Sequence, residues 1–281
     1  MFKLMKYEIR GTYKFVLATI LLVALATVGI QYTMLSFNND LPGRTETGLI
    51  LMIQVLLPIL VIVIMAASIA FIVYLIQSYR KELYEDRGYL TFTLPISGKK
   101  ILGAKFITAV LWYTVFGLIT VGINIFAFRV ILGGEIVRDI SFQLSYYINE
   151  LGRGLLSGML LYGAVSSLAT LLTIYFSITL SKVAIKNRNI GGLWIIIFLL
   201  INGIFNLIEG FILRRLPMYT TLARDSGIIS ANNLSINQSG LLIHTLSGSP
   251  AFSLTGAVYW LIIGVGLFLL TSYLLDRKIE L

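Results

Sequence analysis

The side chains most able to do chemistry in this sequence are gathered in one short stretch between two apolar runs. In chain order they are Glu82, Tyr84, Glu85, Asp86, Arg87, Gly88 and Tyr89. The residues before Gly88 are mostly strong helix formers, and glycine suits the left-handed position that closes a helix. A helix end that carries charges and aromatic rings is suited to insertion into a groove on another protein. We therefore predict a docking surface here, and the alternative is a solvated loop with basic anchors.

Catalytic chemistry has few other candidates in the sequence. The chain has no cysteine and a single histidine, His244, with no carboxylate cluster near it in sequence to complete a metal site. The string Ser97-Gly98-Lys99-Lys100 lacks the first glycine and the final Ser or Thr of a phosphate-binding loop. We therefore expect a chain that is not an enzyme itself and has no metal or cofactor of its own.

The composition indicates a membrane protein. The chain is 57% hydrophobic and 12% charged, with a mean hydropathy of +0.89, outside the usual balance of a soluble domain. Its apolar residues form six runs that are long enough to cross the hydrocarbon layer as helices. The predicted spans are about 15–35, 49–76, 101–128, 155–180, 193–213 and 254–275. This pattern predicts an all-α polytopic membrane protein in which residues 1–281 form a single transmembrane domain.

The basic residues predict how the spans are oriented. Most of the 22 Lys and Arg residues fall at the two termini, in the segment 77–100 and in the loop 182–191. Because Lys and Arg concentrate in cytoplasmic loops, both termini and these two loops are predicted to be cytoplasmic. The net charge of +9 belongs largely to residues that flank spans, so it does not indicate binding to nucleic acid.

The first fourteen residues have a pattern of their own. Lys3, Lys6, Arg10 and Lys14 share one helical face, and apolar residues share another, which predicts an amphipathic N-terminal helix at the membrane interface. The tripeptide Ala24-Leu25-Ala26 is similar to a signal-peptide cleavage site. However, the apolar run continues beyond this tripeptide, so we expect the first span to be retained as an anchor.

Polar residues inside the predicted spans are mainly amides and hydroxyls. Asn124, Asn202 and Asn206 are candidates for lining a pathway, although amides in lipid more often join helices by hydrogen bonds. Charged residues lie only near span ends, as with Lys105 and Glu209. The spans therefore contain no evident ion relay, and the energy for any uphill movement must come from a partner.

The longest predicted external loop covers residues 214–253. It mixes Asn, Ser and Gly with apolar pieces such as 240–246. Loops of this length seldom lack structure of their own, so we expect short helices that dip toward the bilayer.

The docking segment also carries a family signature. The run from Glu85 to Ser97, EDRGYLTFTLPIS, followed by Lys105 and Trp112, resembles a segment of the permease subunits of bacterial type 2 ATP-binding-cassette (ABC) exporters. That segment reads acidic-Gly-Tyr-Leu-Thr-x-Thr-Leu-Pro-x-Ser and lies between spans two and three, as it does here. The family often has an acidic residue directly before Gly-Tyr, whereas this chain has Arg87 after Asp86. The number of spans, the basic N-terminal helix and the large loop before the last span also agree with the family.

The resemblance implies a half-transporter in the bacterial cytoplasmic membrane. Two permease subunits, identical or related, would associate with two separate ATPase subunits that bind ATP and Mg. The coupling helix ending at Arg87 would enter a cleft of the ATPase, and Lys186, Asn187 and Arg188 would form a smaller contact. The pathway would lie between the two permeases, with loop 214–253 at its exit. The implied cargo is amphipathic or hydrophobic, such as an antimicrobial or toxin-like peptide or a lipid.

Two other function classes compete with this reading. A membrane scaffold or sensor that docks a cytoplasmic partner and transports nothing would use the same charged segment. An intramembrane enzyme is disfavoured by the missing catalytic residues. Recovery of a tightly bound ATPase would support the exporter, and transport of a labelled peptide in vesicles would then separate an exporter from a scaffold.

Overall fold

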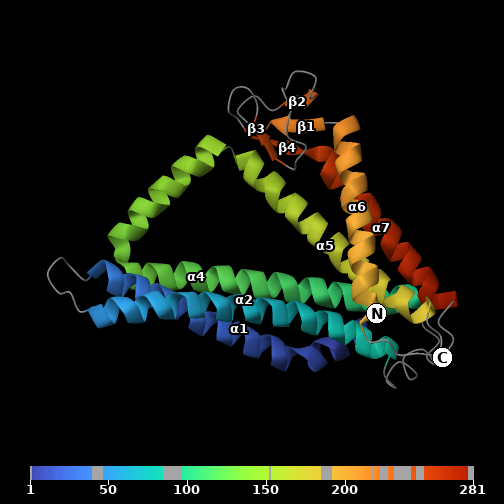
Figure 1. Ribbon diagram of the computed structural model, residues 1–281, viewed down its shortest axis with the longest axis horizontal. Helices are drawn as coiled ribbons and strands as arrows, with labels where there is room; N and C mark the ends of the chain where they lie inside the picture. The colour runs from blue at the N-terminus through green and yellow to red at the C-terminus, as the bar shows by residue number, and fades with distance from the viewer. Residues whose placement is uncertain are drawn as a thin grey trace. The chain divides into compact units, whose positions relative to one another are not determined.

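The computed structural model describes residues 2–39, 47–84, 97–151, 153–184, 192–216, 218–221, 227–230, 242–244 and 250–277 (Figure 1). Among these residues, six helices and four short strands follow one another along the chain. The helices are α1 (Phe2–Asn39), α2 (Thr47–Tyr84), α4 (Gly98–Leu151), α5 (Arg153–Ala184), α6 (Leu193–Arg215) and α7 (Leu254–Arg277). Each helix contains one of the six predicted spans.

Six helices are long and apolar enough to cross a membrane. Lipid offers no hydrogen-bond partner to the backbone, so a spanning segment must satisfy its own N–H and C=O groups, and a helix does so within one segment. Large apolar side chains are exposed along these helices, for example Leu118, Phe126 and Leu207. An outer surface of this kind fits a lipid environment, and the prediction of a membrane protein with six spanning helices is supported.

The helix α4 extends well beyond its predicted span. The third span was expected to end at residue 128, but α4 continues as helix to Leu151, and Figure 1 shows that it bends part-way along. Hydropathy marks the part of a helix that can lie in lipid, whereas the helix itself continues as long as its backbone bonds do. Residues 129–151 contain no proline to stop it.

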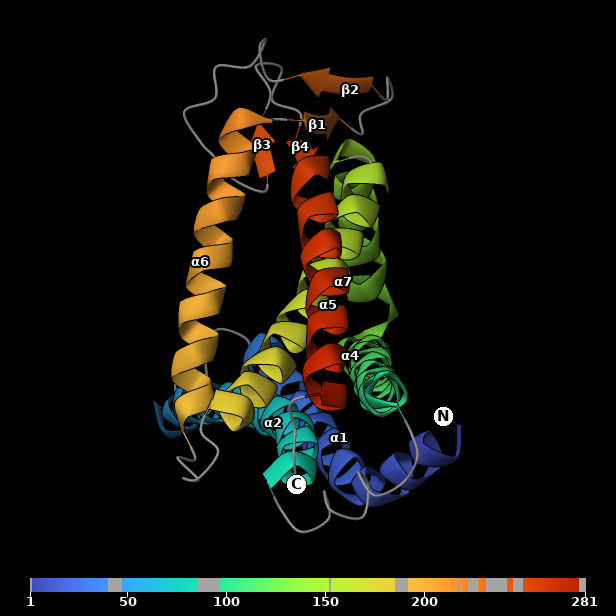
Figure 2. The ribbon, with the colours of Figure 1, turned by 90° about the vertical axis from the view of Figure 1, so that its right-hand side faces the viewer.

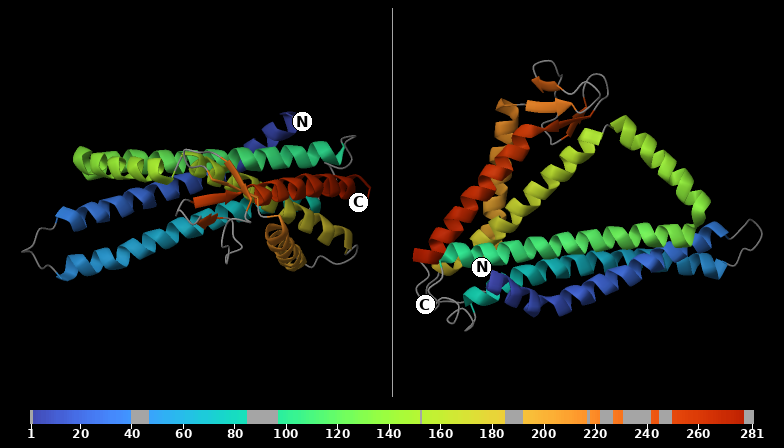
Figure 3. Two further views of the ribbon diagram at one scale, coloured as in Figure 1. Left: turned by 90° about the horizontal axis from the view of Figure 1, so that it is seen from above. Right: turned by 180° about the vertical axis from the view of Figure 1, so that it is seen from behind.

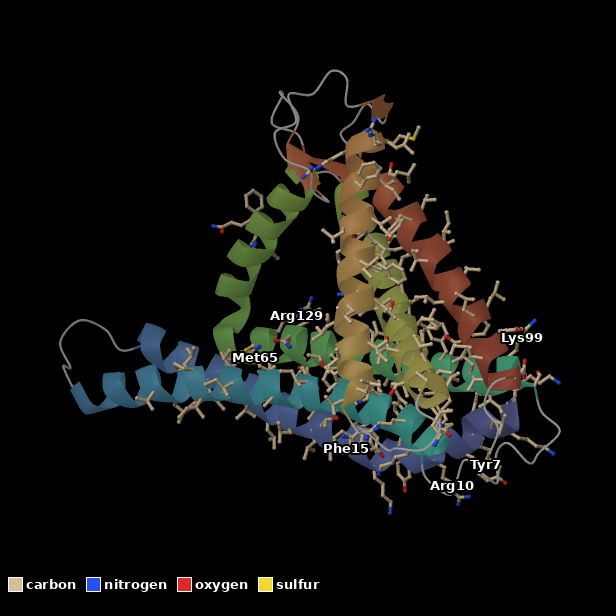
Figure 4. All side chains as sticks on the ribbon, turned by 45° about the vertical axis from the view of Figure 1, so that its right-hand side comes forward. Tyr7, Arg10, Phe15, Met65, Lys99 and Arg129 are labelled. Carbon is tan, nitrogen blue, oxygen red and sulfur yellow. The ribbon has the colours of Figure 1, made fainter. Side chains whose placement is uncertain are left out.

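The amphipathic N-terminal segment is helical, as predicted, and it is the beginning of α1 and not a separate helix. Figure 2 shows that α1 curves near this end. The basic side chains of this segment are exposed, and Figure 4 shows Arg10 pointing away from the helix. Its position at a membrane interface stays a prediction.

The described residues of the loop 214–253 that follow α6 form a small sheet and not the short helices that we expect from the sequence. Strands β1 (Met218–Thr221), β2 (Gly227–Ser230), β3 (Leu242–His244) and β4 (Pro250–Ser253) form an antiparallel sheet in the order β2-β1-β4-β3. Tyr219 pairs with Ile229 on one side and with Ser253 on the other. Short runs rich in Thr, Tyr and Ile favour strands, and four residues are too few for a stable helix. The expectation of an all-α chain therefore holds for the spans and is wrong for this loop.

The chain divides into two compact units. The first comprises Met1–Tyr79 and Gly103–Gln143, and the second comprises Arg80–Leu102 and Leu144–Leu281. The prediction of one transmembrane domain stays a prediction, and each unit is described by itself.

In the first unit, α1, α2 and the first part of α4 run alongside one another (Figure 3). The ring of Phe15 on α1 stacks on Tyr74 of α2 at 4.0 Å between ring centroids. Phe71 of α2 stacks in the same way on Phe116 of α4 at 4.4 Å. These aromatic pairs, together with the buried Val16, hold the three helices together.

In the second unit, α5 packs closely against α7, and α6 packs against both. A methyl group placed on Gly264 of α7 would meet Ala169 of α5 at 3.7 Å, so the two backbones approach closely at these small residues. The core also contains Tyr175 and Trp260, which are almost fully buried. Figure 2 shows the strands at one end of α6 and α7.

Candidate functional site

The predicted docking segment joins α2 to α4. Glu82 and Tyr84 lie in the last turn of α2, as predicted, and Glu85, Asp86, Arg87, Gly88 and Tyr89 lie outside the described residues. Lys186, Asn187 and Arg188, the predicted second contact, also lie outside them. The structure therefore describes the two helices that flank the docking segment. The assignment of the docking segment as an ATPase contact stays a prediction.

The end of α2 has the two-sided character that the sequence predicts. Tyr79 and Leu83 are four residues apart on one helical face, and both are buried. Lys81, on another face, is exposed. The helix thus arrives at the segment with one face packed and another face available to solvent or a partner.

Three polar side chains of the first unit form a cluster that we call the basal clamp: Glu8 of α1, Ser78 of α2 and Lys105 of α4. The ammonium nitrogen Nζ of Lys105 lies 2.5 Å from Oε1 of Glu8. The Ser78 hydroxyl donates to Oε2 of Glu8 at 3.2 Å, and Lys105 Nζ donates to the Ser78 carbonyl oxygen at 3.3 Å. The Lys105 side chain is only 8% exposed, and that of Glu8 is 21% exposed. The basal clamp therefore joins three helices through a largely desolvated ion pair.

Further hydrogen bonds hold α1 in the same register. The indole Nε1 of Trp112 donates to the Thr12 hydroxyl oxygen at 2.8 Å, and that hydroxyl donates to the Glu8 carbonyl at 2.8 Å. The Tyr74 hydroxyl donates to the Gly11 carbonyl at 3.3 Å. Because these bonds lie within one helical turn of Glu8 along α1, they fix the carboxylate that pairs with Lys105.

The sequence gives Lys105 as a basic residue at a span end but does not identify its partner. Glu8 was not predicted to have a role. Glu8 is the one acidic residue among positions 1–39, in a segment otherwise rich in Lys and Arg. A single carboxylate among basic residues is the sequence feature from which a role for Glu8 could have been predicted.

In the second unit, the start of α4 is fixed to the end of α7. The backbone N–H of Gly98 donates to Oδ1 of Asp276 at 2.5 Å. The first N–H groups of a helix lack partners inside it, and a carboxylate there is also favoured by the helix dipole. Ser97 precedes the helix, and its carbonyl accepts from the N–H groups of Lys100 and Ile101. Figure 4 shows Lys99, also at this helix start, pointing away from it.

Replacing Gly98 by alanine is expected to destabilise the chain by about 1–3 kcal/mol, the usual cost of overpacking. A Cβ atom at this position would lie 2.8 Å from Cβ of Leu275 and 2.9 Å from Oδ1 of Asp276. Leu275 is buried and cannot move away freely, so the contact between α4 and α7 must open. Thermal unfolding of the purified chain measures the effect.

Gly117 supplies the matched control for Gly98. It lies on the same helix and is exposed, and an added Cβ would meet nothing within 4 Å. Alanine there is expected to stabilise the chain by roughly 0.5–1 kcal/mol through helix propensity. Equal effects of the two substitutions would contradict a close approach at Gly98.

Of the three asparagines predicted to line a pathway, Asn124 and Asn206 have side-chain amides that donate within their own helices. The side-chain amide of Asn124 donates to the Thr120 carbonyl at 2.8 Å, and that of Asn206 donates to the Asn202 carbonyl at 2.7 Å. Asn124 and Asn206 are exposed, so neither serves as a buried joint between helices within this chain. Their role in a pathway stays a prediction.

A carboxylate that the sequence places at a span end is held by two aromatic donors. Oε1 of Glu209 on α6 accepts from the Tyr162 hydroxyl of α5 at 2.9 Å and from Nε1 of Trp260 of α7 at 3.0 Å. Neither aromatic residue was predicted to have a role. The signal that could have found this site is Glu209 itself, an acidic residue inside an otherwise apolar span.

No protein-family model, curated protein or solved structure matches this chain. Within the described residues, no group of three or more His, Cys, Asp or Glu side chains could hold a metal ion. The function must therefore be argued from the residues and their geometry.

Proposed function

We propose that the chain is the membrane-spanning permease subunit of an ATP-driven ABC exporter. The observation that carries the proposal is the run from Glu85 to Ser97, which stands between the second and third of six helices long enough to span a membrane. This is the position and the sequence pattern of the coupling segment in type 2 ABC exporter permeases. A separate ATPase binds ATP and Mg and supplies the energy.

The helices around the segment support a mechanical role. Force applied to the segment enters α2 at Tyr84 and α4 at Gly98, because these helices end and begin there. The basal clamp joins α2 to α1 and α4 within the first unit. The bond from Gly98 to Asp276 joins the start of α4 to α7 within the second. Helices are stiff along their axes, so a displacement of the segment reaches elements that cross the membrane.

The proposed assembly contains two permease subunits and two ATPase subunits. The segment around Lys186 to Arg188 makes a second, smaller contact with the ATPase. The pathway lies between the permeases, and the loop that contains β1–β4 lies at its outer end. In keeping with the resemblance to exporter permeases, the proposed cargo is an amphipathic or hydrophobic molecule, such as a peptide or a lipid.

Purification from native membranes in a mild detergent tests the proposal. We expect an ATPase with a phosphate-binding loop to co-purify with the tagged chain and to hydrolyse Mg-ATP in the eluate. Uptake of a labelled peptide or lipid by inverted vesicles should then depend on ATP. A chain that is recovered without any nucleotide-binding protein contradicts the proposal, and a stable complex that moves no cargo indicates the scaffold or sensor.

A further inference from the structure

The proposed coupling of ATP hydrolysis does not use the site formed by Glu209, Tyr162 and Trp260. Glu209 lies in the apolar span Leu193–Arg215 of α6, six residues before its end. At a rise of 1.5 Å per residue, this is roughly 9 Å along the helix axis from Arg215. A carboxylate at such a depth in an apolar span is costly unless something compensates its charge.

The protein compensates this carboxylate only in part. Its two hydrogen bonds, from Tyr162 and Trp260, both reach Oε1. Oε2 has no hydrogen bond to a described residue and is not among the buried polar atoms that lack a partner, so it is accessible. A carboxylate can accept about four hydrogen bonds, and at least half of this capacity is unused.

A basic side chain does not neutralise Glu209 in the part of the chain that the structure describes. The ion pair between Glu8 and Lys105 lies in the other unit. The two donors to Glu209 are neutral, and they orient the carboxylate without cancelling its charge. Among the described residues the carboxylate therefore lacks a cationic complement, which a cation from outside the chain would supply.

The surroundings select an organic cation over a metal ion. Calcium and magnesium need several oxygen ligands, and the described residues offer no acidic or histidine cluster to supply them. One ammonium group, in contrast, matches one carboxylate. Large apolar side chains are exposed along α6, among them Ile208 and Phe211, so the surroundings of this helix suit a hydrocarbon chain.

We propose that Glu209, oriented by Tyr162 and Trp260, binds the ammonium group of a cationic amphiphile. The binding itself does not depend on the exporter proposal. The assignment of the amphiphile as cargo does rest on the exporter proposal. This assignment narrows the cargo to molecules that carry an amino group beside an apolar part. Two kinds of molecule carry such an ammonium group. One is an aminolipid, in its headgroup, and the other is an apolar peptide, in a lysine side chain or at its amino terminus.

Calorimetric titration of the full-length chain in neutral maltoside micelles tests the site. Dodecylammonium is the probe, and dodecanol is the uncharged control of the same chain length. We expect dodecylammonium to bind at least about tenfold more tightly to the wild-type chain than to Glu209→Gln, as expected for loss of a charge-assisted hydrogen bond. Glutamine keeps an oxygen that can accept from Tyr162 and Trp260, so the substitution removes the charge with little change of shape. Dodecanol should not distinguish the two proteins.

Asn206→Ala is the matched control on the same helix. Its amide bonds within α6 and is exposed, so its loss should leave dodecylammonium affinity unchanged. Trp260→Phe keeps an aromatic ring but removes the N–H donor, and it provides a second variant if Glu209→Gln does not fold. We expect weaker binding of dodecylammonium by Trp260→Phe and unchanged binding of dodecanol.

The same titration distinguishes the sources of the ammonium group. One arm uses a phosphatidylethanolamine lipid, and the other uses a short apolar peptide with one lysine, compared with its norleucine twin. Equal binding of dodecylammonium by the wild-type chain and Glu209→Gln overturns the proposal, and it is also the result expected if Glu209 takes up only a proton. If dodecylammonium binding depends on Glu209 but the chain recruits no ATPase, the proposed ammonium site is supported and only the exporter proposal is contradicted.

Discussion

Replacing Glu8 by alanine is expected to destabilise the chain by about 3 kcal/mol, because it leaves Lys105 charged and largely buried without its carboxylate. Removing one partner of a buried ion pair costs far more than removing both, since the remaining charge keeps its desolvation penalty. The same substitution also frees Ser78 from its bond to Oε2 of Glu8. The apparent melting temperature in detergent should fall by roughly 6–12 °C.

Lys6→Ala is the control for this experiment. Lys6 lies on the same helix, two residues before Glu8, and is exposed, so its loss should change stability by about 0.5 kcal/mol or less. The double variant Glu8→Leu with Lys105→Met should recover much of the lost stability, because both charges are then absent. A Glu8→Ala chain as stable as Lys6→Ala would show that the basal clamp does not hold α1, α2 and α4 together.

Reversing the charges of Glu82, Glu85 and Asp86 to lysine is expected to lower recovery of the ATPase subunit at least about tenfold. A docking surface that meets complementary charge would instead meet charge of its own sign, and each such juxtaposition costs several kcal/mol. The substitutions add lysine to a loop predicted to be cytoplasmic, so they keep the charge bias that orients the spans. Co-purification and Mg-ATP hydrolysis in the eluate measure the effect.

Two variants in which three acidic residues are neutralised, and not reversed in charge, control for the loss of acidic residues in general. In one variant Glu82, Glu85 and Asp86 become Gln, Gln and Asn. In the other, three acidic residues on the predicted opposite side, Glu46, Glu135 and Asp139, are neutralised in the same way. Only the first variant should lose ATPase. If the charge-reversed chain keeps its ATPase at wild-type recovery, the acidic residues of the docking segment do not form the contact.

The sequence predicts the spanning helices well because one local property determines them. A run such as 193–213 is apolar over its whole length, and in lipid the backbone of such a run must bond to itself. The helix α6 accordingly covers Leu193–Arg215. Hydropathy says less about where a helix stops outside lipid, which is why α4 continues past residue 128 to Leu151.

Contacts between distant residues were beyond prediction from local pattern. Glu8 and Lys105 come from different helices, as do Gly98 and Asp276, and nothing in the spacing of one residue reports the other. The sheet in loop 214–253 was missed for the same reason. Its strands have three or four residues each, and they are stable only through pairing such as that of β1 with β4.

For the Glu209 site, the sequence identifies the carboxylate but not the residues that bond to it. An acidic residue in an apolar span is visible in the sequence, and such residues are commonly functional. Its donors, Tyr162 and Trp260, come from the neighbouring helices α5 and α7, 47 and 51 residues away along the chain. Only the packing of α5, α6 and α7 identifies which aromatic residues orient the carboxylate.

Site-specific photo-cross-linking shows whether the docking segment contacts an ATPase subunit in the membrane. A photoreactive amino acid replaces Tyr89 in the docking segment, and a control chain carries it at Tyr32, an exposed residue of α1 at the opposite end of the first span from the N-terminus. After illumination in native membranes, mass spectrometry identifies the adducts. We predict that position 89, and not position 32, joins the chain to a protein with a phosphate-binding loop, and that the yield changes when Mg-ATP is added. The absence of such an adduct at position 89, from a chain that is present in the membrane at normal amounts, would contradict the assignment of this protein as an ABC exporter permease.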